Sequence, residues 1–258
     1  MRQDKDSAIR KVQTASISGF IRRILADAAN AWRLSQRAIV AIVILPFVIA
    51  LSGVIAAILG KGVYKWYIQE DGPVEDLQVL FWALASIFCI LTIRKLWQSG
   101  DQWIALLYIG VFIFILFTIG EEISWGQRIF GWVTPSNLEE LNRQGETNLH
   151  NLRGLEKLLR LAQLLIGAYG TFMPLVALHP SFLRHHRKLI PMIIPHYSLI
   201  PYFFLLFAWR VIHNLTPLTK SHPYAADEYS EIIELILAIG VFLFMFFQVR
   251  QSKKSKIL

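Results

Sequence analysis

Long apolar runs separated by short polar connections fill most of the chain. A helix rises about 1.5 Å per residue, so roughly 20 apolar residues cross the ~30 Å hydrocarbon core of a bilayer. Backbone amides within lipid must be satisfied inside the segment, and we therefore expect helices rather than strands. The pattern predicts an all-α fold, a six-span transmembrane helical bundle. Its spans are Ala38–Gly60, Leu77–Ile93, Trp103–Gly120, Leu161–Leu178, Leu189–His213 and Ile232–Val249.

Prolines and glycines add detail to the fourth and fifth spans. Pro191 and Pro195 suit an opening turn of the fifth span, whereas Pro201 is expected to kink its middle because proline lacks an N–H. Gly167 and Gly170 in the fourth span are expected to let a neighbouring helix approach closely.

The placement of charged residues predicts the orientation. Seventeen of the 26 Lys and Arg residues lie in the N-terminal segment, the second and fourth connections and the tail. These segments are expected in the cytoplasm, with both termini inside, as an even number of spans requires. Fourteen of the 18 acidic residues then lie on or near the outer face. The net charge of +8 is therefore interpreted as a topology signal, and no nucleic-acid-binding motif accompanies it.

Composition and spacing divide the chain into three regions. Residues 1–37 form a basic cytoplasmic segment, residues 38–249 the membrane domain, and residues 250–258 a basic tail. With 55% hydrophobic residues and one cysteine, the composition excludes a disordered chain and a disulfide framework. In the first region, apolar residues recur at helical spacing. They predict an amphipathic helix, either on the inner leaflet or packed as a linker, built on Ile17, Phe20, Ile21, Ile24, Leu25 and Ala28.

The acidic pair Glu121-Glu122 ends the third span, which runs outward. Carboxylates are disfavoured at a helix C-terminus, so the pair points either to function or to a specific partner. One structural alternative is an ion pair with Arg128 or Arg210. The other is continuation of the helix, which would place Glu121, Ser124, Trp125 and Arg128 on one face.

The sixth span opens with acidic residues at helical spacing. Asp227, Glu231 and Glu234 share one helix face, and Glu234 lies about one turn inside the apolar run. A membrane-embedded carboxylate is costly unless it is paired or faces an aqueous cavity. Glu231 and Glu234 are therefore candidate site residues.

Two further pairs lie near the same face. Glu146 and His150 are four residues apart, so they meet if the segment is helical, and His150 becomes a metal ligand or general base. Arg210 and His213 are suited to an anionic group such as a lipid phosphate, although snorkelling to the interface is an alternative explanation.

Several carboxylates with one histidine are typical of a divalent-metal site. The candidate ligands are Glu121, Glu122, Glu146, His150, Glu231 and Glu234. The candidate catalytic residues are Glu121, Glu122, His150 and Glu231, and the candidate substrate-binding residues are Trp125, Arg128, Arg210 and His213.

We hypothesise a membrane-embedded hydrolase or transferase whose outward site acts on a lipid or lipid-linked substrate. One alternative is a non-catalytic assembly protein whose acids form salt bridges or bind a cation. The other is a proton- or cation-coupled transporter, for which the inner half supplies few polar residues.

Two stretches carry a resemblance. GEEISWGQRIFG at Gly120–Gly131 and GETNLHN at Gly145–Asn151 resemble a group of uncharacterised bacterial multi-span membrane proteins. The resemblance implies a bacterial inner-membrane protein and carries no activity with it.

Overall fold

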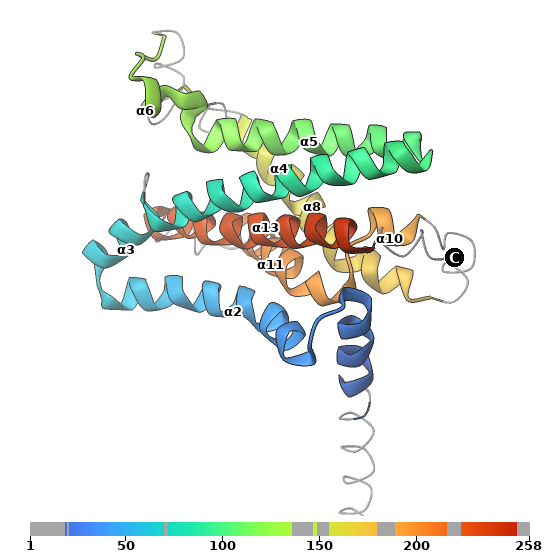
Figure 1. Cartoon of the computed structure of the whole chain (residues 1–258). Coiled ribbons are helices and arrows are strands. Elements are labelled where there is room, and N and C mark those ends of the chain that lie inside the picture. The colour runs from blue at the N-terminus through green and yellow to red at the C-terminus, as the bar shows by residue number, and fades with distance from the viewer. Residues whose placement is uncertain are drawn as a thin grey trace, which may run out of the picture. The chain divides into compact units, whose positions relative to one another are not determined.

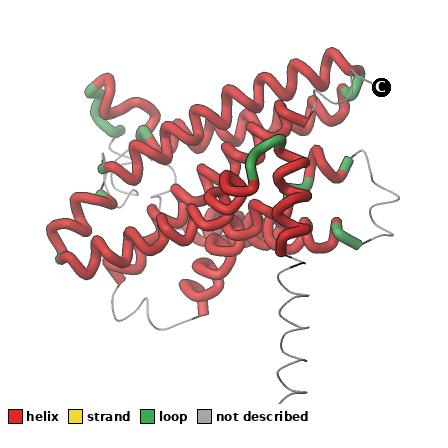
Figure 2. The backbone as a smooth tube through the Cα atoms, turned by 60° about the horizontal axis from the view of Figure 1, so that its bottom comes forward, coloured by secondary structure: helices red, strands yellow, loops and turns green. Residues whose placement is uncertain are grey.

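The computed structural model describes residues 19, 21–69, 72–135, 147–148, 155–179, 189–215 and 223–251, with some side chains inside these ranges left out. The chain divides into two compact units, residues 1–45 and residues 46–258. All regular elements in the described residues are helices (Figure 2), which confirms the predicted all-α class.

The first unit contains a helix over residues 21–32 and the start of α2 (Gln36–Leu59). A turn at Arg33, with a positive φ of 54°, separates them. Ser35 caps α2, because its side-chain oxygen accepts a hydrogen bond from the Ala38 backbone N–H at 3.2 Å. Ile17 and Phe20 lie outside the described residues, so the interfacial placement of the N-terminal helix stays a prediction.

The second unit holds most of the membrane helices. Among the described residues, six segments are long and apolar enough to cross a membrane, as predicted. They cover Gln36–Leu59, Lys61–Ser99, Gln102–Glu122, Lys157–Ala177, Ile190–Asn214 and Glu228–Arg250. The helices within them, besides α2, are α3 (Lys61–Ile68), α4 (Pro73–Ser99), α5 (Gln102–Glu122), α8 (Leu155–Ala177), α10 (Ile190–Ile193), α11 (Ile200–Leu215) and α13 (Pro223–Gln251).

Helix α13 is the most buried of the spans. It packs along α4 and α11, while α4 also packs along α5, and α11 along α8 (Figure 1). Phe88 of α4 contacts Phe242 and Phe246 of α13, with ring centroids 5.8 and 5.3 Å apart. Glu75 and Asp76 lie in the first turn of α4, where the helix dipole favours carboxylates.

Small residues bring α8 and α11 together, which confirms the prediction for Gly167 and Gly170. A Cβ atom on Gly167 would lie 2.7 Å from the backbone nitrogen of Phe207. A Cβ atom on Gly170 would collide with the ring of Phe203. Small residues at such positions allow two helix backbones to approach closely.

We expect Gly167→Ala to lower the free energy of unfolding by about 1–3 kcal/mol, the usual cost of overpacking. The nearest atom belongs to the backbone of α11 and cannot rotate away. Gly110→Ala is the matched control, because it changes a helical glycine of α5 that has open space around it. The control should be neutral or stabilising by up to about 1 kcal/mol. Equal stability of the two variants in detergent unfolding would contradict the expected close packing.

The fifth span is interrupted, and the predicted kink at Pro201 is wrong. The break lies at residues 194–196, between α10 and the short 3₁₀ helix Tyr197–Leu199, and Pro201 sits in the first turn of α11. Ile194 is extended (φ −101°, ψ 127°) because a residue that precedes a proline disfavours the helical region.

Side chains from three neighbouring helices donate hydrogen bonds to backbone carbonyl oxygens of α10, which the break leaves without partners in a continuing helix. Tyr108 of α5 donates to Met192 at 2.6 Å, and Gln248 of α13 donates to Pro191 at 2.8 Å. Tyr169 of α8 donates to Ile193 at 2.7 Å. Interrupted helices are tolerated at membrane depth when neighbours satisfy the freed backbone groups in this way.

Candidate functional site

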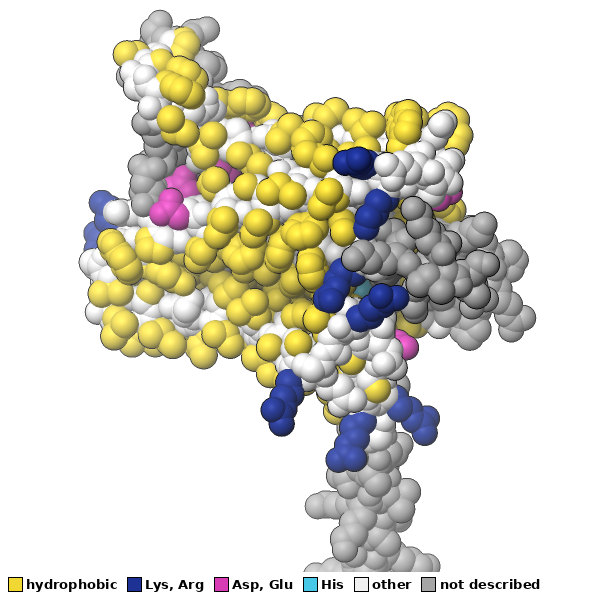
Figure 3. Space-filling view, viewed as in Figure 1, with side chains coloured by type: hydrophobic (Ala, Val, Ile, Leu, Met, Phe, Trp, Pro, Cys, Tyr) yellow, Lys and Arg dark blue, Asp and Glu magenta, His cyan; other side chains and the backbone are white. Residues whose placement is uncertain are grey.

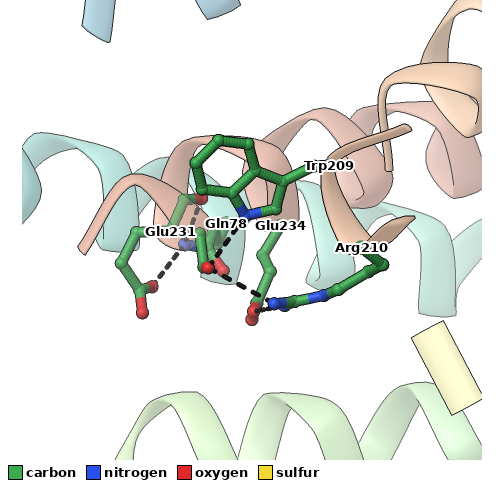
Figure 4. A network of polar contacts seen from close by, with 6 residues as sticks. Gln78, Trp209, Arg210, Glu231 and Glu234 are labelled. Atoms are coloured by element: carbon green, nitrogen blue, oxygen red, sulfur yellow. Dashed lines mark hydrogen bonds and ion pairs between the residues drawn. The ribbon is translucent and has the colours of Figure 1, made fainter. Parts of the chain in front are cut away.

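Polar side chains from α4, α5, α11 and α13 gather at one end of the second unit. Two of them, Glu231 and Glu234, share a face of α13, as their spacing predicts, but they reach partners on different helices. Glu231 contacts Gln78 of α4, and Glu234 contacts Arg210 of α11 (Figure 4). In this view, both carboxylates and the guanidinium lie on the same side of the network, opposite the ring of Trp209.

The ion pair between Arg210 and Glu234 is the strongest polar contact of the group. Arg210 Nη2 lies 2.9 Å from Glu234 Oε1, and the exposed fractions of the two side chains are 4% and 26%. Arg210 Nη1 also donates to Ser230 Oγ at 3.3 Å, and Trp209 Nε1 donates to the same oxygen at 3.1 Å. A buried charge paired and hydrogen-bonded in this way avoids most of its desolvation penalty.

Arg210 also has features that the ion pair does not account for. Its Nε is buried and has no hydrogen-bond partner. A second arginine, Arg160 of α8, acts on it electrostatically. Two like charges held in range of each other cost free energy unless anions or solvent compensate them.

Gln78 lies one turn inside α4 and is fully buried. Its Nε2 donates to the backbone oxygen of Glu231 and to Glu231 Oε2, both at 3.1 Å. The other end of the amide, Oε1, is buried without a hydrogen-bond partner. Buried unpartnered acceptors are rare in folded proteins and often mark a site that takes a water, an ion or a ligand group.

Glu121 lies at the end of α5 and is buried, with 5% of its surface exposed. Its Oε1 accepts a hydrogen bond from Trp125 Nε1 at 2.6 Å. The Trp125 ring folds back over Gly120 and packs edge-on against Phe117, with ring centroids 5.6 Å apart. Trp125 therefore holds the Glu121 carboxylate in place.

Glu122 has acidic neighbours on three helices. Glu231, Glu234, Glu75 and Glu121 all act on it electrostatically. These acids come from α4, α5 and α13, so tertiary packing rather than sequence proximity assembles the group. We call the following residues the polar cluster: Glu75, Gln78, Glu121, Glu122, Arg210, Glu231 and Glu234.

The alternative of a helix that continues from Gly120 through Arg128 is wrong. Helix α5 ends at Glu122, and Ser124 and Trp125 adopt left-handed φ values of 47° and 52°. These conformations reverse the chain before the short helix α6 (Gln127–Phe130). Glu121, Ser124, Trp125 and Arg128 therefore do not line one helical face, since that arrangement needs unbroken helical geometry.

The two stretches of the bacterial resemblance meet in space. Gln127 Nε2 donates to Thr134 Oγ1 at 2.8 Å, and Gln127 Oε1 accepts from the Thr147 backbone N–H at 2.7 Å. Asn148 Nδ2 approaches Ser124 Oγ at 3.4 Å. The contacts fix residues 147–148 against the segment that follows the Glu-Glu pair.

The structure accounts for only part of the predicted site. Arg210 was a candidate partner for the Glu121-Glu122 pair, but its ion pair is with Glu234. His213 lies beside Trp209, with ring centroids 6.2 Å apart. Glu146, His150 and the side chain of Arg128 lie outside the described residues, so their predicted roles stay predictions.

The predicted metal site remains untested. Within the described part of the chain, no three His, Cys, Asp or Glu side chains are close enough together to hold a metal ion. Glu121, Glu122, Glu231 and Glu234 therefore form no complete ligand set by themselves. A complete set requires additional ligands such as Glu146 and His150.

Sequence reasoning missed Gln78, Ser230 and Arg160. Gln78 could have been recognised from the sequence, because its amide side chain lies one turn inside an apolar span. Ser230 and Arg160 look ordinary at span ends, where serine and snorkelling arginine are common. Only the packing of α8, α11 and α13 reveals their proximity to Arg210.

Comparison with known proteins adds no assignment to this geometry: no protein-family model, curated protein or solved structure matches the chain. The fold and the polar cluster therefore carry the functional argument alone. The fold is that of a multi-pass helical membrane protein, with a group of carboxylates and one buried arginine at one end of its second unit.

Proposed function

We propose that this protein is a membrane-embedded hydrolase or transferase that uses the polar cluster to act on a lipid or lipid-linked substrate. The observation that supports this most is the convergence of carboxylates from α4, α5 and α13 on Glu122, beside a buried arginine. Ionisable residues within membrane spans are costly, and such residues usually mark functional sites. The distribution of Lys and Arg supports a cytoplasmic location of both termini, and the resemblance of Gly120–Gly131 and Gly145–Asn151 supports a bacterial inner-membrane protein.

The cluster offers complementary chemical groups. Glu122 is our candidate general base, because its carboxyl is surrounded by other acids and has no basic partner among the described contacts. Arg210 is the candidate group for an anionic part of the substrate, since its buried Nε has no hydrogen-bond partner and a guanidinium suits phosphate geometry. Trp125 and Glu231 fix the positions of neighbouring carboxylates and amides.

A lipid substrate fits the location of the cluster. The acids lie at the ends of membrane spans, where lipid headgroups meet the protein surface. Headgroups carry the anionic and ester groups on which paired acids and arginines act.

A divalent cation is part of this proposal. Glu231 would supply an oxygen ligand, with Glu146 and His150 as further candidates outside the described residues, while Glu122 acts as the base. Such an ion would polarise a phosphoryl or carbonyl oxygen or activate water. Oxygen ligands suit Mg²⁺, Ca²⁺ or Mn²⁺, and an imidazole extends the range to Zn²⁺.

The test is a lipid-turnover assay on purified full-length protein in liposomes of bacterial total lipid extract. Lipids are compared by mass spectrometry with protein-free liposomes, with added divalent cations and with chelator. We expect one lipid species to decrease and a product to appear. Unchanged lipid composition under all conditions would overturn the proposal.

A second candidate function is a non-catalytic assembly protein, and specific contacts favour it. Glu234 is already paired with Arg210, and Glu121 with the Trp125 indole, as expected of structural acids. A transporter receives less support, because Ser86 and Thr92 in the inner half donate to carbonyls of their own helix.

A further inference from the structure

The segment that follows α5 exposes large hydrophobic side chains. We call residues 123–133, which contain α6, the projecting loop. Phe130 and Val133 have exposed fractions of 72% and 86%, and Ile129 and Trp132 are also exposed. The rings of Phe130 and Trp132 stack with centroids 5.3 Å apart, so the apolar groups form one patch.

The projecting loop leaves the bundle sideways. Figure 1 shows α6 turning away from the axis of α5 instead of continuing along it, and Figure 3 shows hydrophobic side chains over this part of the chain. A segment that turns off the axis of its span at the membrane surface runs along that surface rather than straight out into water. Contiguous exposed apolar patches on such segments mark membrane or protein contacts.

The shape of the projecting loop is fixed by its own contacts. The side chain of Gln127 forms hydrogen bonds with the side chain of Thr134 and the backbone of Thr147, which anchor the projecting loop to the chain that follows it. Gly126 and Gly131 flank α6 and have positive φ values of 84° and 70°, so the chain changes direction at both ends of this helix. The exposed side chains are therefore held outward by a defined scaffold.

The same apolar surface continues onto the membrane-facing side of α5. Ile113, Phe114 and Leu116 are exposed on this span, as expected for side chains that face lipid. Since α5 ends at Glu122, the loop begins where the span leaves the hydrocarbon core. Aromatic residues are enriched at this level of a membrane.

We propose that the projecting loop inserts Ile129, Phe130, Trp132 and Val133 into the lipid leaflet at the polar-cluster end. Its occupant is the bilayer itself, because the patch continues the lipid-facing surface of α5. Trp125 links the loop to the cluster through its hydrogen bond to Glu121, so the insertion sets the height of that carboxylate relative to lipid headgroups. The inference does not depend on the proposed reaction.

The experiment measures the depth of spin labels in liposomes. Cys89 is the single cysteine of the chain, and its replacement by alanine allows a label at Phe130→Cys or Val133→Cys. Both side chains are mostly exposed, so either position can accommodate a label. Asp101→Cys, an exposed position at the opposite end of α5, is the control. Cys89→Ser serves as a second background if the alanine variant does not fold.

We expect labels at Phe130 and Val133 to be relaxed by oxygen rather than by a water-soluble nickel chelate. Their depth should be about 5–10 Å below the phosphate level, as for interfacial helices. The Asp101 label should be relaxed by the nickel chelate. Nickel accessibility at Phe130 equal to that at Asp101 would overturn the proposal. A label shielded from both reagents would overturn it as well, because it would place the loop against protein, for instance a second copy of the chain.

Discussion

Replacing Arg210 with methionine is expected to lower the free energy of unfolding by about 3 kcal/mol, at the low end for breaking a buried ion pair. The loss arises because Glu234 remains as a charge without its partner. We use the low end because Glu234 is 26% exposed and solvent compensates part of its charge. The measurement is reversible unfolding of the purified protein in mixed detergent micelles.

The double variant Arg210→Met, Glu234→Leu is the matched control. It removes both charges, and hydrophobic replacement of a buried ion pair is often neutral or stabilising. We therefore expect it to recover most of the lost stability. If Arg210→Met alone changes stability by less than about 0.5 kcal/mol, the pair is a surface-like contact and the argument for a costly buried charge is wrong.

In the lipid-turnover assay, Glu122→Gln is expected to lower the rate by about 10²–10⁴-fold, the usual contribution of a general base. Glutamine keeps the size of the side chain and removes its ability to take a proton. The variant should fold as well as the natural chain, because Glu122 makes no ion pair among the described contacts. Rates and unfolding are measured on the same preparations.

Asp76→Asn is the control for a general loss of negative charge at the polar-cluster end of the protein. Asp76 is exposed in the first turn of α4 and outside the polar cluster. Its loss should cost at most about 1 kcal/mol of helix-dipole stabilisation and leave the rate within about twofold. An Asp76→Asn rate as low as that of Glu122→Gln would assign the effect to bulk charge rather than to a base.

The membrane helices could be predicted because the bilayer imposes the same requirements of length and backbone hydrogen bonding on every span. Each apolar run must be about 20 residues long and satisfy its own backbone, and the runs from Ala38 to Val249 meet this rule. The interruption of the fifth span could not be located, because the rule does not say where neighbouring side chains will satisfy a broken backbone. Tyr108, Tyr169 and Gln248 do so at residues 191–193.

The sequence predicts which residues belong to the polar cluster better than it predicts which of them pair with one another. Sequence alone indicates that Glu234 and Arg210 each need a partner, because both are costly inside a membrane. Which residues pair depends on helix rotation, and α13 faces α11 at Glu234 and α4 at Glu231. The reversal after Glu122 was also unpredictable, because Ser124 and Trp125 rarely adopt left-handed backbone.

Cysteine accessibility tests whether the polar cluster lies at the outer surface of a membrane. In a Cys89→Ala background, Asp76→Cys reports the cluster end of α4, and Asp101→Cys reports the opposite end of α5. Spheroplasts that express each variant are treated with a membrane-impermeant maleimide before and after lysis. We expect Asp76→Cys to be labelled in intact spheroplasts and Asp101→Cys to be labelled only after lysis. The reverse pattern would contradict it.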